Sequence, residues 1–281
     1  MKNKIIKNNL GLLILIIFFL ILGSFNLIRY VNNFNDYADA QKEYMIMCET
    51  EYLDNTDYDE FCDRVFEKGE IEKYDVRYIF LENIMDSREA FFILTPFIIV
   101  FAVLIDHKNQ KLTRTKLCVK DFFKRTYKYS LVIPFYVMFL FLLSYLASSG
   151  FTKTPVLNYD WYFNFIAGQN SMLSSFKLLS YYVVNGYLFS LFILGVSELI
   201  FIKTKKFKME LLSFVSIYLV VVIFFELFLG VLVSNLVRDQ NLLTYFSLFN
   251  FWNLSSNFYV LTIRNFVLAI IPLVILHFKK K

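Results

Sequence analysis

Few side chains in this sequence have the types and spacing that catalysis or metal binding requires. The two histidines, His107 and His277, lie far apart in the chain, so they cannot form a zinc helix of the His-Glu-x-x-His type. The sequence contains no Gly-x-x-x-x-Gly-Lys-Ser/Thr phosphate loop and no Gly-x-Ser-x-Gly nucleophile elbow. These absences argue against an enzyme, and we expect no metal, no cofactor and no ATPase motif in this chain.

The three cysteines divide between two chemically different segments. Cys48 and Cys62 lie in an acidic segment, residues 31–89, whereas Cys118 lies in a basic loop. If the acidic segment lies outside the cell, Cys48 and Cys62 could form a disulfide. Two free thiols fit the sequence equally well, because spacing in the chain gives no distance between the sulfur atoms.

Three charged residues interrupt otherwise apolar runs: Glu198, Glu226 and Arg264. Charge is expensive inside a membrane, so such residues are usually paired or directed to water. Glu226 and Arg264 lie at similar depths from the outer ends of the last two apolar runs, which predicts either a buried ion pair or an Arg264 side chain that reaches outward. Glu198 lies near an inner end, where its side chain could reach water beside Lys203.

The apolar runs that carry these charges have the length of membrane spans. Hydrophobic residues make up 57% of the 281 residues, and the mean hydropathy is +0.51. About 20 apolar residues cross a bilayer as a helix. We therefore predict an all-α, polytopic membrane protein with a single transmembrane domain of six spans, at about residues 10–30, 90–105, 130–148, 178–202, 211–233 and 258–278. The first run is interpreted as a retained span, since the nearest small-x-small site, Ala38-Asp39-Ala40, lies too far past its apolar core for signal cleavage.

Charge is unevenly distributed and orients the predicted spans. Residues 31–89 hold seventeen of the 24 acidic residues but six of the 29 basic residues. Basic residues concentrate at both termini and in the loops after spans two and four, which the positive-inside rule places in the cytoplasm. We therefore predict a multi-pass protein of the cell membrane with both termini cytoplasmic, an extracellular insertion at residues 31–89, and no nucleic-acid partner.

The predicted outer segments differ in character. Within the insertion, either residues 57–68 form a helix and the apolar stretch at residues 76–85 packs on something, or the whole segment is a solvated loop. Aromatic residues clustered at residues 159–165 are typical of an interfacial belt. Residues 234–257 are too apolar for a free loop, and they predict an apolar outer hairpin with a short helix in the outer leaflet.

The basic loop between spans two and three contains a segment with helical periodicity. On a helix over residues 112–128, one face is mostly apolar and the other is mostly basic. The apolar face comprises Leu112, Cys118, Val119, Phe122, Phe123 and Tyr127, and the other comprises Arg114, Lys120, Asp121, Lys124, Arg125 and Lys128. From the residues alone, a helix lying in the lipid headgroups explains this pattern best.

Several features together resemble the permease subunits of type-2 ABC transporters, of the small kind found in Gram-positive bacteria. The resemblance rests on six spans with both ends inside, the basic loop after span two and the apolar outer hairpin before span six. Its local motifs are Phe91-Phe-Ile-Leu-Thr-Pro96 leading to Asp106, then Lys111-Leu-Thr-Arg114, then Lys124-Arg125-x-Tyr127-x-Tyr129. The pattern covers the chain from about residue 10 to its end.

The resemblance implies a half-transporter that moves an amphipathic peptide, a lipid-linked molecule or a drug-like compound outward. Its partners would be a cytosolic ABC ATPase subunit and a second permease subunit, identical or a sister. The basic loop would be the coupling helix that enters a groove of the ATPase. The contact residues would be Arg114, Val119, Phe122, Phe123, Lys124, Arg125 and Tyr127. Two other classes stay open: a sensor or bacteriocin-immunity protein whose segment 31–89 binds a cationic peptide, and a secondary carrier.

Overall fold

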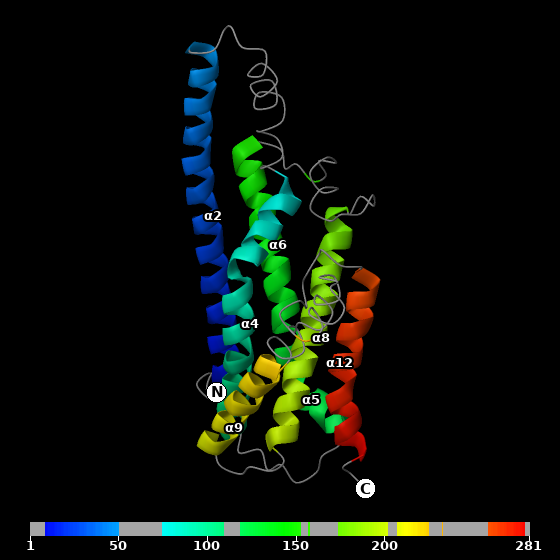
Figure 1. The fold of residues 1–281 in the computed structure, drawn as a ribbon. Helices are drawn as coiled ribbons and strands as arrows, with labels where there is room; N and C mark the ends of the chain where they lie inside the picture. Colours follow the sequence, from blue (N-terminus) through cyan, green and yellow to red (C-terminus); the bar gives the residue numbers. More distant parts are fainter. Residues whose placement is uncertain are drawn as a thin grey trace. The chain divides into compact units, whose positions relative to one another are not determined.

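Helices account for every regular element in the described part of the chain. The computed structural model describes residues 9–50, 75–109, 119–152, 157, 174–201, 207–224, 232 and 258–278. The helices are α2 (Leu10–Thr50), α4 (Val76–Asn109), α5 (Val119–Ser130), α6 (Val132–Thr152), α8 (Ser175–Phe201), α9 (Phe207–Ile223) and α12 (Phe258–Phe278), labelled in Figure 1. The predicted all-α class is therefore confirmed.

Four helical stretches in the described residues are long and apolar enough to cross a membrane, and one of them begins in α5 and continues through α6. The stretches are Leu10–Asn32, Thr126–Gly150, Ser175–Phe201 and Tyr259–Phe278. Two shorter apolar helices, Phe91–Asp106 and Leu211–Val220, match predicted spans two and five, but they are too short to count as spans by length alone. The structure thus supports a membrane protein with four candidate spans, and six spans stay a prediction.

Two helices extend into the predicted insertion. Helix α2 continues past its apolar part to Thr50, and α4 begins at Val76, well before the apolar run that starts at Phe91. Both helices therefore continue beyond the predicted spans, which end at about residue 30 and begin at about residue 90, because extending an existing helix costs far less than nucleating a new one. The apolar stretch at residues 76–85 does pack, since Val76, Ile79 and Phe80 are fully buried. The helix predicted at residues 57–68 and the outer segments 159–165 and 234–257 lie outside the described residues.

The chain divides into two compact units. Unit 1 comprises Met1–Leu20, Arg88–Val137 and Leu179–Lys281, and unit 2 comprises Ile21–Ser87 and Met138–Leu178. Helices α2, α4, α6 and α8 therefore contribute to both units. Each unit has its own buried side chains, and each is described separately below.

Aromatic rings dominate the core of unit 1. Phe91 stacks on Tyr136 with ring centroids 5.7 Å apart, and Phe19 lies 4.7 Å from the same tyrosine ring. Phe92 meets Phe189 edge-on at 5.1 Å. Such ring pairs add roughly 0.5–1.5 kcal/mol each beyond the area that they bury. These contacts join α2, α4, α6 and α8 inside unit 1.

Helices α8 and α12 approach each other closely within unit 1. A Cβ atom on Gly195 would lie 2.8 Å from the Pro272 side chain, so the absence of a side chain at Gly195 permits this approach. Leu188, Leu191 and Ala269 form a buried apolar cluster between the two helices. Elsewhere in unit 1, α9 packs against α4, where the Tyr218 hydroxyl donates a 2.7 Å hydrogen bond to the Phe92 carbonyl.

Unit 2 is held by both apolar and amide contacts. Phe80 of α4 meets Phe141 of α6 edge-on at 5.5 Å. The Asn26 side chain of α2 donates a 3.3 Å hydrogen bond to the Asn83 carbonyl. Asn26 and Asn83 are both buried, so this bond ties α2 to α4 where water cannot replace it.

Candidate functional site

The helix predicted over residues 112–128 is present in the described part of the chain as α5, Val119–Ser130, whereas residues 112–118 lie outside the described residues. Its amphipathic character is visible in the burial of its side chains. Thr126 and Tyr129 are buried, whereas Lys124 faces outward. Tyr127, which the sequence placed on the apolar face, is 57% exposed and also faces outward. Arg114 lies outside the described residues, and so do the side chains of Val119 and Arg125.

The apolar face of α5 packs against its own protein. Phe122 is 1% exposed, and Phe123 packs against the apolar cluster between α8 and α12. Figure 1 shows α5 beside these two helices, and α5 contacts α12 directly. The interpretation that Phe122 enters a groove of the partner is therefore corrected, because a side chain buried in its own unit has no surface left to offer. The outward residues of α5 described here are Lys124 and Tyr127.

Proline explains why α5 and α6 are separate helices. Helix α5 ends at Ser130, and α6 begins at Val132. Pro134 has no backbone N–H, so it cannot donate to the Ser130 carbonyl as a helical residue four positions later would. The first α6 bond instead runs from the Phe135 amide to the Leu131 carbonyl, at 3.0 Å. The helical hydrogen bonding is therefore interrupted at Leu131, and we call this break between α5 and α6 the elbow.

A buried carboxylate collects polar contacts at the end of the apolar run in α4. The Asp106 side chain is 1% exposed. Its oxygens accept hydrogen bonds from the backbone amides of Gly11, at 2.7 Å, and Leu12, at 3.2 Å. The Tyr129 hydroxyl donates a third bond, at 2.5 Å. Asp106 thus caps the first turn of α2, where helical amides have no acceptor of their own, and also binds the last turn of α5.

Lysine completes this cluster. The Lys128 ammonium lies 3.6 Å from Asp106 and donates a 2.8 Å hydrogen bond to the Asn9 side chain. Its side chain is 22% exposed, so the cation balances the buried carboxylate while it reaches toward the surface. We call Asn9, Gly11, Asp106, Lys128 and Tyr129 the Asp106 cluster.

Backbone proximity makes the Asp106 cluster geometrically feasible. A Cβ atom on Gly11 would lie 2.0 Å from the Ala102 carbonyl oxygen, well inside van der Waals contact. Ala102 lies one helical turn before Asp106, so the backbones of α2 and α4 touch beside the carboxylate. In the sequence, Asp106 was noted only as the residue that follows the Phe91–Pro96 motif. A glycine near the start of one apolar run and an acid at the end of the next was the signal that could have found the cluster.

The structure describes two of the three predicted intramembrane charges, Arg264 and Glu198. Glu226 lies outside the described residues, so its pairing with Arg264 stays a prediction. Arg264 of α12 donates from Nε to the Asn265 side-chain oxygen at 3.1 Å. Asn265 in turn donates to the Asn185 side chain of α8 at 2.5 Å. Glu198 is 2% exposed, so its side chain is enclosed by protein. This differs from the expectation that it could reach water beside Lys203.

Amide groups therefore link α8 and α12 inside unit 1. Besides accepting from Asn265, Asn185 donates to the Thr262 hydroxyl at 3.2 Å and to the Tyr181 carbonyl at 2.9 Å. Asn185 and Asn265 are each fully buried. Model systems give about 0.6–2 kcal/mol for such a contact between membrane helices, so this link stabilises the α8–α12 pair. Sequence reasoning missed these residues, because asparagine within an apolar run carries no charge to mark it.

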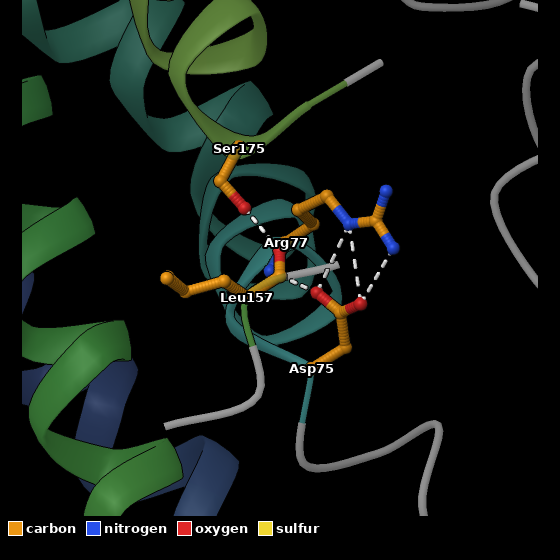
Figure 2. A network of polar contacts seen from close by, with 4 residues as sticks. All are labelled: Asp75, Arg77, Leu157 and Ser175. Carbon is orange, nitrogen blue, oxygen red and sulfur yellow. Dashed lines mark hydrogen bonds and ion pairs between the residues drawn. The ribbon is translucent and has the colours of Figure 1, made fainter. Parts of the chain in front are cut away.

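A further buried ion pair lies in unit 2, at the start of α4. Asp75 accepts from the Arg77 backbone amide at 2.7 Å, as a helix N-cap does. Figure 2 shows the same carboxylate facing the Arg77 guanidinium, with its closest nitrogen–oxygen distance at 2.7 Å. The picture also shows the Ser175 hydroxyl donating to the Leu157 carbonyl. Asp75 and Arg77 are 4% and 1% exposed, which makes this pair structural rather than a surface for ligands.

The remaining predictions concern metal binding and the cysteines. In the described residues, no group of three or more histidine, cysteine or acidic side chains is placed to hold a metal ion. The side chains of Cys48 and Cys62 lie outside the description, so the predicted disulfide stays untested. Comparison with known proteins gives no match to any family model, to any curated protein or to any solved structure.

Proposed function

We propose that this chain is the membrane-spanning permease subunit of an ABC exporter. It moves an amphipathic substrate outward and uses a separate cytosolic ATPase subunit, together with a second permease subunit that is identical or a sister. The observation that carries the proposal is helix α5. Its apolar face is buried in its own protein, and its outward face presents Lys124 and Tyr127.

Burial of this apolar face argues against a lipid anchor. An interfacial anchor holds its protein on a membrane by inserting its apolar face among the acyl chains. In α5 the corresponding residues, Phe122 and Phe123, pack within unit 1 instead. A helix that is fixed to the spans and shows a cation and an aromatic ring outward is suited to receive force from a soluble partner. Tyrosine is enriched at binding hot spots. Charged residues such as lysine steer a partner of opposite charge toward the interface.

Co-purification tests this proposal. An affinity-tagged chain, extracted from its native membrane, is expected to carry an ATPase subunit that mass spectrometry identifies by its phosphate loop. The double variant Lys124→Glu plus Tyr127→Ala is expected to lower the ATPase yield about tenfold or more, because it reverses the charge and removes the aromatic contact.

A matched control uses the same two substitutions elsewhere on the chain. Lys177→Glu plus Tyr145→Ala changes two exposed residues outside α5 and should leave the ATPase yield unchanged. An equal ATPase yield in both double variants would contradict the contact through α5. A wild-type chain that carries no ATPase but binds a cationic peptide would favour the sensor or immunity class instead.

A further inference from the structure

Asp106 serves two helices at once. Its carboxylate accepts from the Gly11 and Leu12 amides of α2 and from the Tyr129 hydroxyl of α5. All these groups belong to unit 1. Because one carboxylate satisfies both helix ends, the end of α5 cannot move away from α4 without disturbing the acceptor that caps α2.

Helix α5 has a second anchor of a different physical kind. Phe123 packs against Leu188, Leu191 and Ala269 of α8 and α12. Apolar contact is non-directional, so it survives a small rotation of the helix. Hydrogen bonds weaken steeply once their angle departs from linearity, so the Tyr129 contact breaks early in such a rotation. A rotation of α5 about Phe123 therefore breaks the hydrogen bond between Tyr129 and Asp106 before it breaks the apolar contact of Phe123.

The elbow at Leu131 separates this motion from α6. Tyr129 lies on the α5 side of the elbow, and Tyr136 lies on the α6 side, stacked against Phe91. Because Pro134 interrupts the backbone hydrogen bonding between the two helices, they do not form one rigid rod, and α5 can rotate while α6 stays in place. The aromatic core thus holds α6, while the Asp106 cluster holds the end of α5.

We infer that Asp106 and Tyr129 form a releasable clasp through which a displacement of α5 reaches the first turn of α2. Both are positioning residues. The source of the displacement, an ATPase docked on α5, rests on the proposed function, whereas the clasp itself does not. When the partner turns α5, the Tyr129 hydroxyl leaves Asp106, water enters, and the cap on α2 loosens. The inner end of the first predicted span is thereby released in step with the partner.

Amide hydrogen exchange tests the clasp in the full-length chain alone, purified into lipid nanodiscs. Tyr129→Phe removes a hydroxyl that touches neither the Gly11 nor the Leu12 amide. We nevertheless expect both amides to exchange about fivefold faster or more, because loss of a charge-assisted bond opens the cluster more often. Asp106→Asn removes the charge and replaces one acceptor oxygen with an NH2 donor, so it should accelerate exchange at least as much.

Tyr145→Phe is the matched control for this measurement. It is the same substitution at a tyrosine that is 38% exposed on α6, and it should leave exchange at both amides within about twofold of wild type. Equal exchange in Tyr129→Phe and Tyr145→Phe would overturn the clasp, since the cap on α2 would then be independent of α5. Tyr129→Phe keeps the ring and its packing, so the test stands even where Asp106→Asn fails to fold.

ATP turnover by the chain with its co-purifying ATPase tests transmission. Tyr129→Phe is expected to leave the ATPase yield and the KM for ATP within about twofold, while kcat shifts about threefold or more toward that of the isolated ATPase. A purely structural defect would lower the yield instead, and a kcat equal to that of Tyr145→Phe would overturn the transmission role. A wild-type chain without any ATPase would defeat the proposed function, and the exchange measurement then decides the clasp alone.

Discussion

Individual residues matter most where two backbones touch. Gly11 lets α2 approach the Ala102 carbonyl closely enough for Asp106 to reach the first amides of the helix. An added methyl group there would have to push two backbones apart, and backbone atoms cannot yield as the end of a flexible side chain can. The cost of a side chain at Gly11 is therefore set by tertiary contact and not by helix propensity.

Gly11→Ala is expected to lower the free energy of unfolding by roughly 1–3 kcal/mol or more, through overpacking and loss of the cap. Gly150→Ala provides the control, because nothing lies within 4 Å of a Cβ atom at that position in α6. Alanine is the better helix former by roughly 0.5–1 kcal/mol, so Gly150→Ala should be neutral or stabilising. Denaturant titration of the purified variants in detergent measures both. A loss of stability of equal size in both variants would contradict the close approach of α2 and α4.

At the scale of elements, α5 is part of the protein core as much as part of its surface. If Phe122 and Phe123 only contacted a partner, as the resemblance implies, Phe122→Ala plus Phe123→Ala would leave the protein folded and would only uncouple it. Because Phe122 is 1% exposed, its truncation should instead leave a cavity. The expectation is revised accordingly.

Phe122→Ala is expected to lower the free energy of unfolding by roughly 3–5 kcal/mol, as large-to-small changes in cores do. Phe135→Ala, on α6 in the same unit, truncates a ring that is 64% exposed, and it should cost far less. Thermal unfolding followed by intrinsic tyrosine and tryptophan fluorescence compares the two. Similar midpoints would show that α5 does not bury its apolar face in the membrane-bound protein.

The start of α4 offers a test of a buried ion pair. Asp75→Asn breaks the carboxylate contact to the Arg77 guanidinium, which is expected to cost roughly 3–5 kcal/mol, because this ion pair is buried and the arginine loses the carboxylate at 2.7 Å. Replacing both partners, as in Asp75→Asn plus Arg77→Met, should recover part of that loss, since no buried charge then remains. Denaturant titration of both variants measures this difference. A double variant less stable than Asp75→Asn would refute the account.

At the scale of the whole molecule, orientation in the membrane follows from charge. Lys124 precedes α6 and Lys177 follows it in the chain, so a single candidate span, Thr126–Gly150, separates the two positions. The positive-inside rule places Lys124 in the cytoplasm and hence Lys177 outside. This assignment is a prediction from the sequence, and it requires no placement of the two units relative to each other.

Cysteine labelling checks the orientation. In a variant whose three native cysteines are replaced by serine, Lys177→Cys should react with an impermeant maleimide in intact cells, whereas Lys124→Cys should react only after the membrane is permeabilised. Both side chains are exposed, so failure to react reflects the side of the membrane and not burial. The reverse pattern would invert the predicted topology and place α5 where no cytosolic ATPase can reach it.

The sequence by itself determined the helical, membrane-embedded character of this protein. Apolar runs of sufficient length must satisfy their backbone groups internally in lipid, so Leu10–Asn32 and Tyr259–Phe278 could be predicted as helices without any tertiary contact. The amphipathic pattern that became α5 was also visible, because periodicity is a local property.

Only the tertiary structure decided what the two faces of α5 contact. Periodicity marks an apolar face, but whether Phe122 meets lipid, a partner or its own chain depends on segments far away in the sequence. The same holds for Asp106, whose partners Gly11 and Tyr129 come from other helices. The continuation of α2 to Thr50 was likewise hidden, since helix propagation through polar residues leaves no hydrophobic pattern. Packing brings together residues that are far apart in the sequence, and the proposed clasp consists of such contacts.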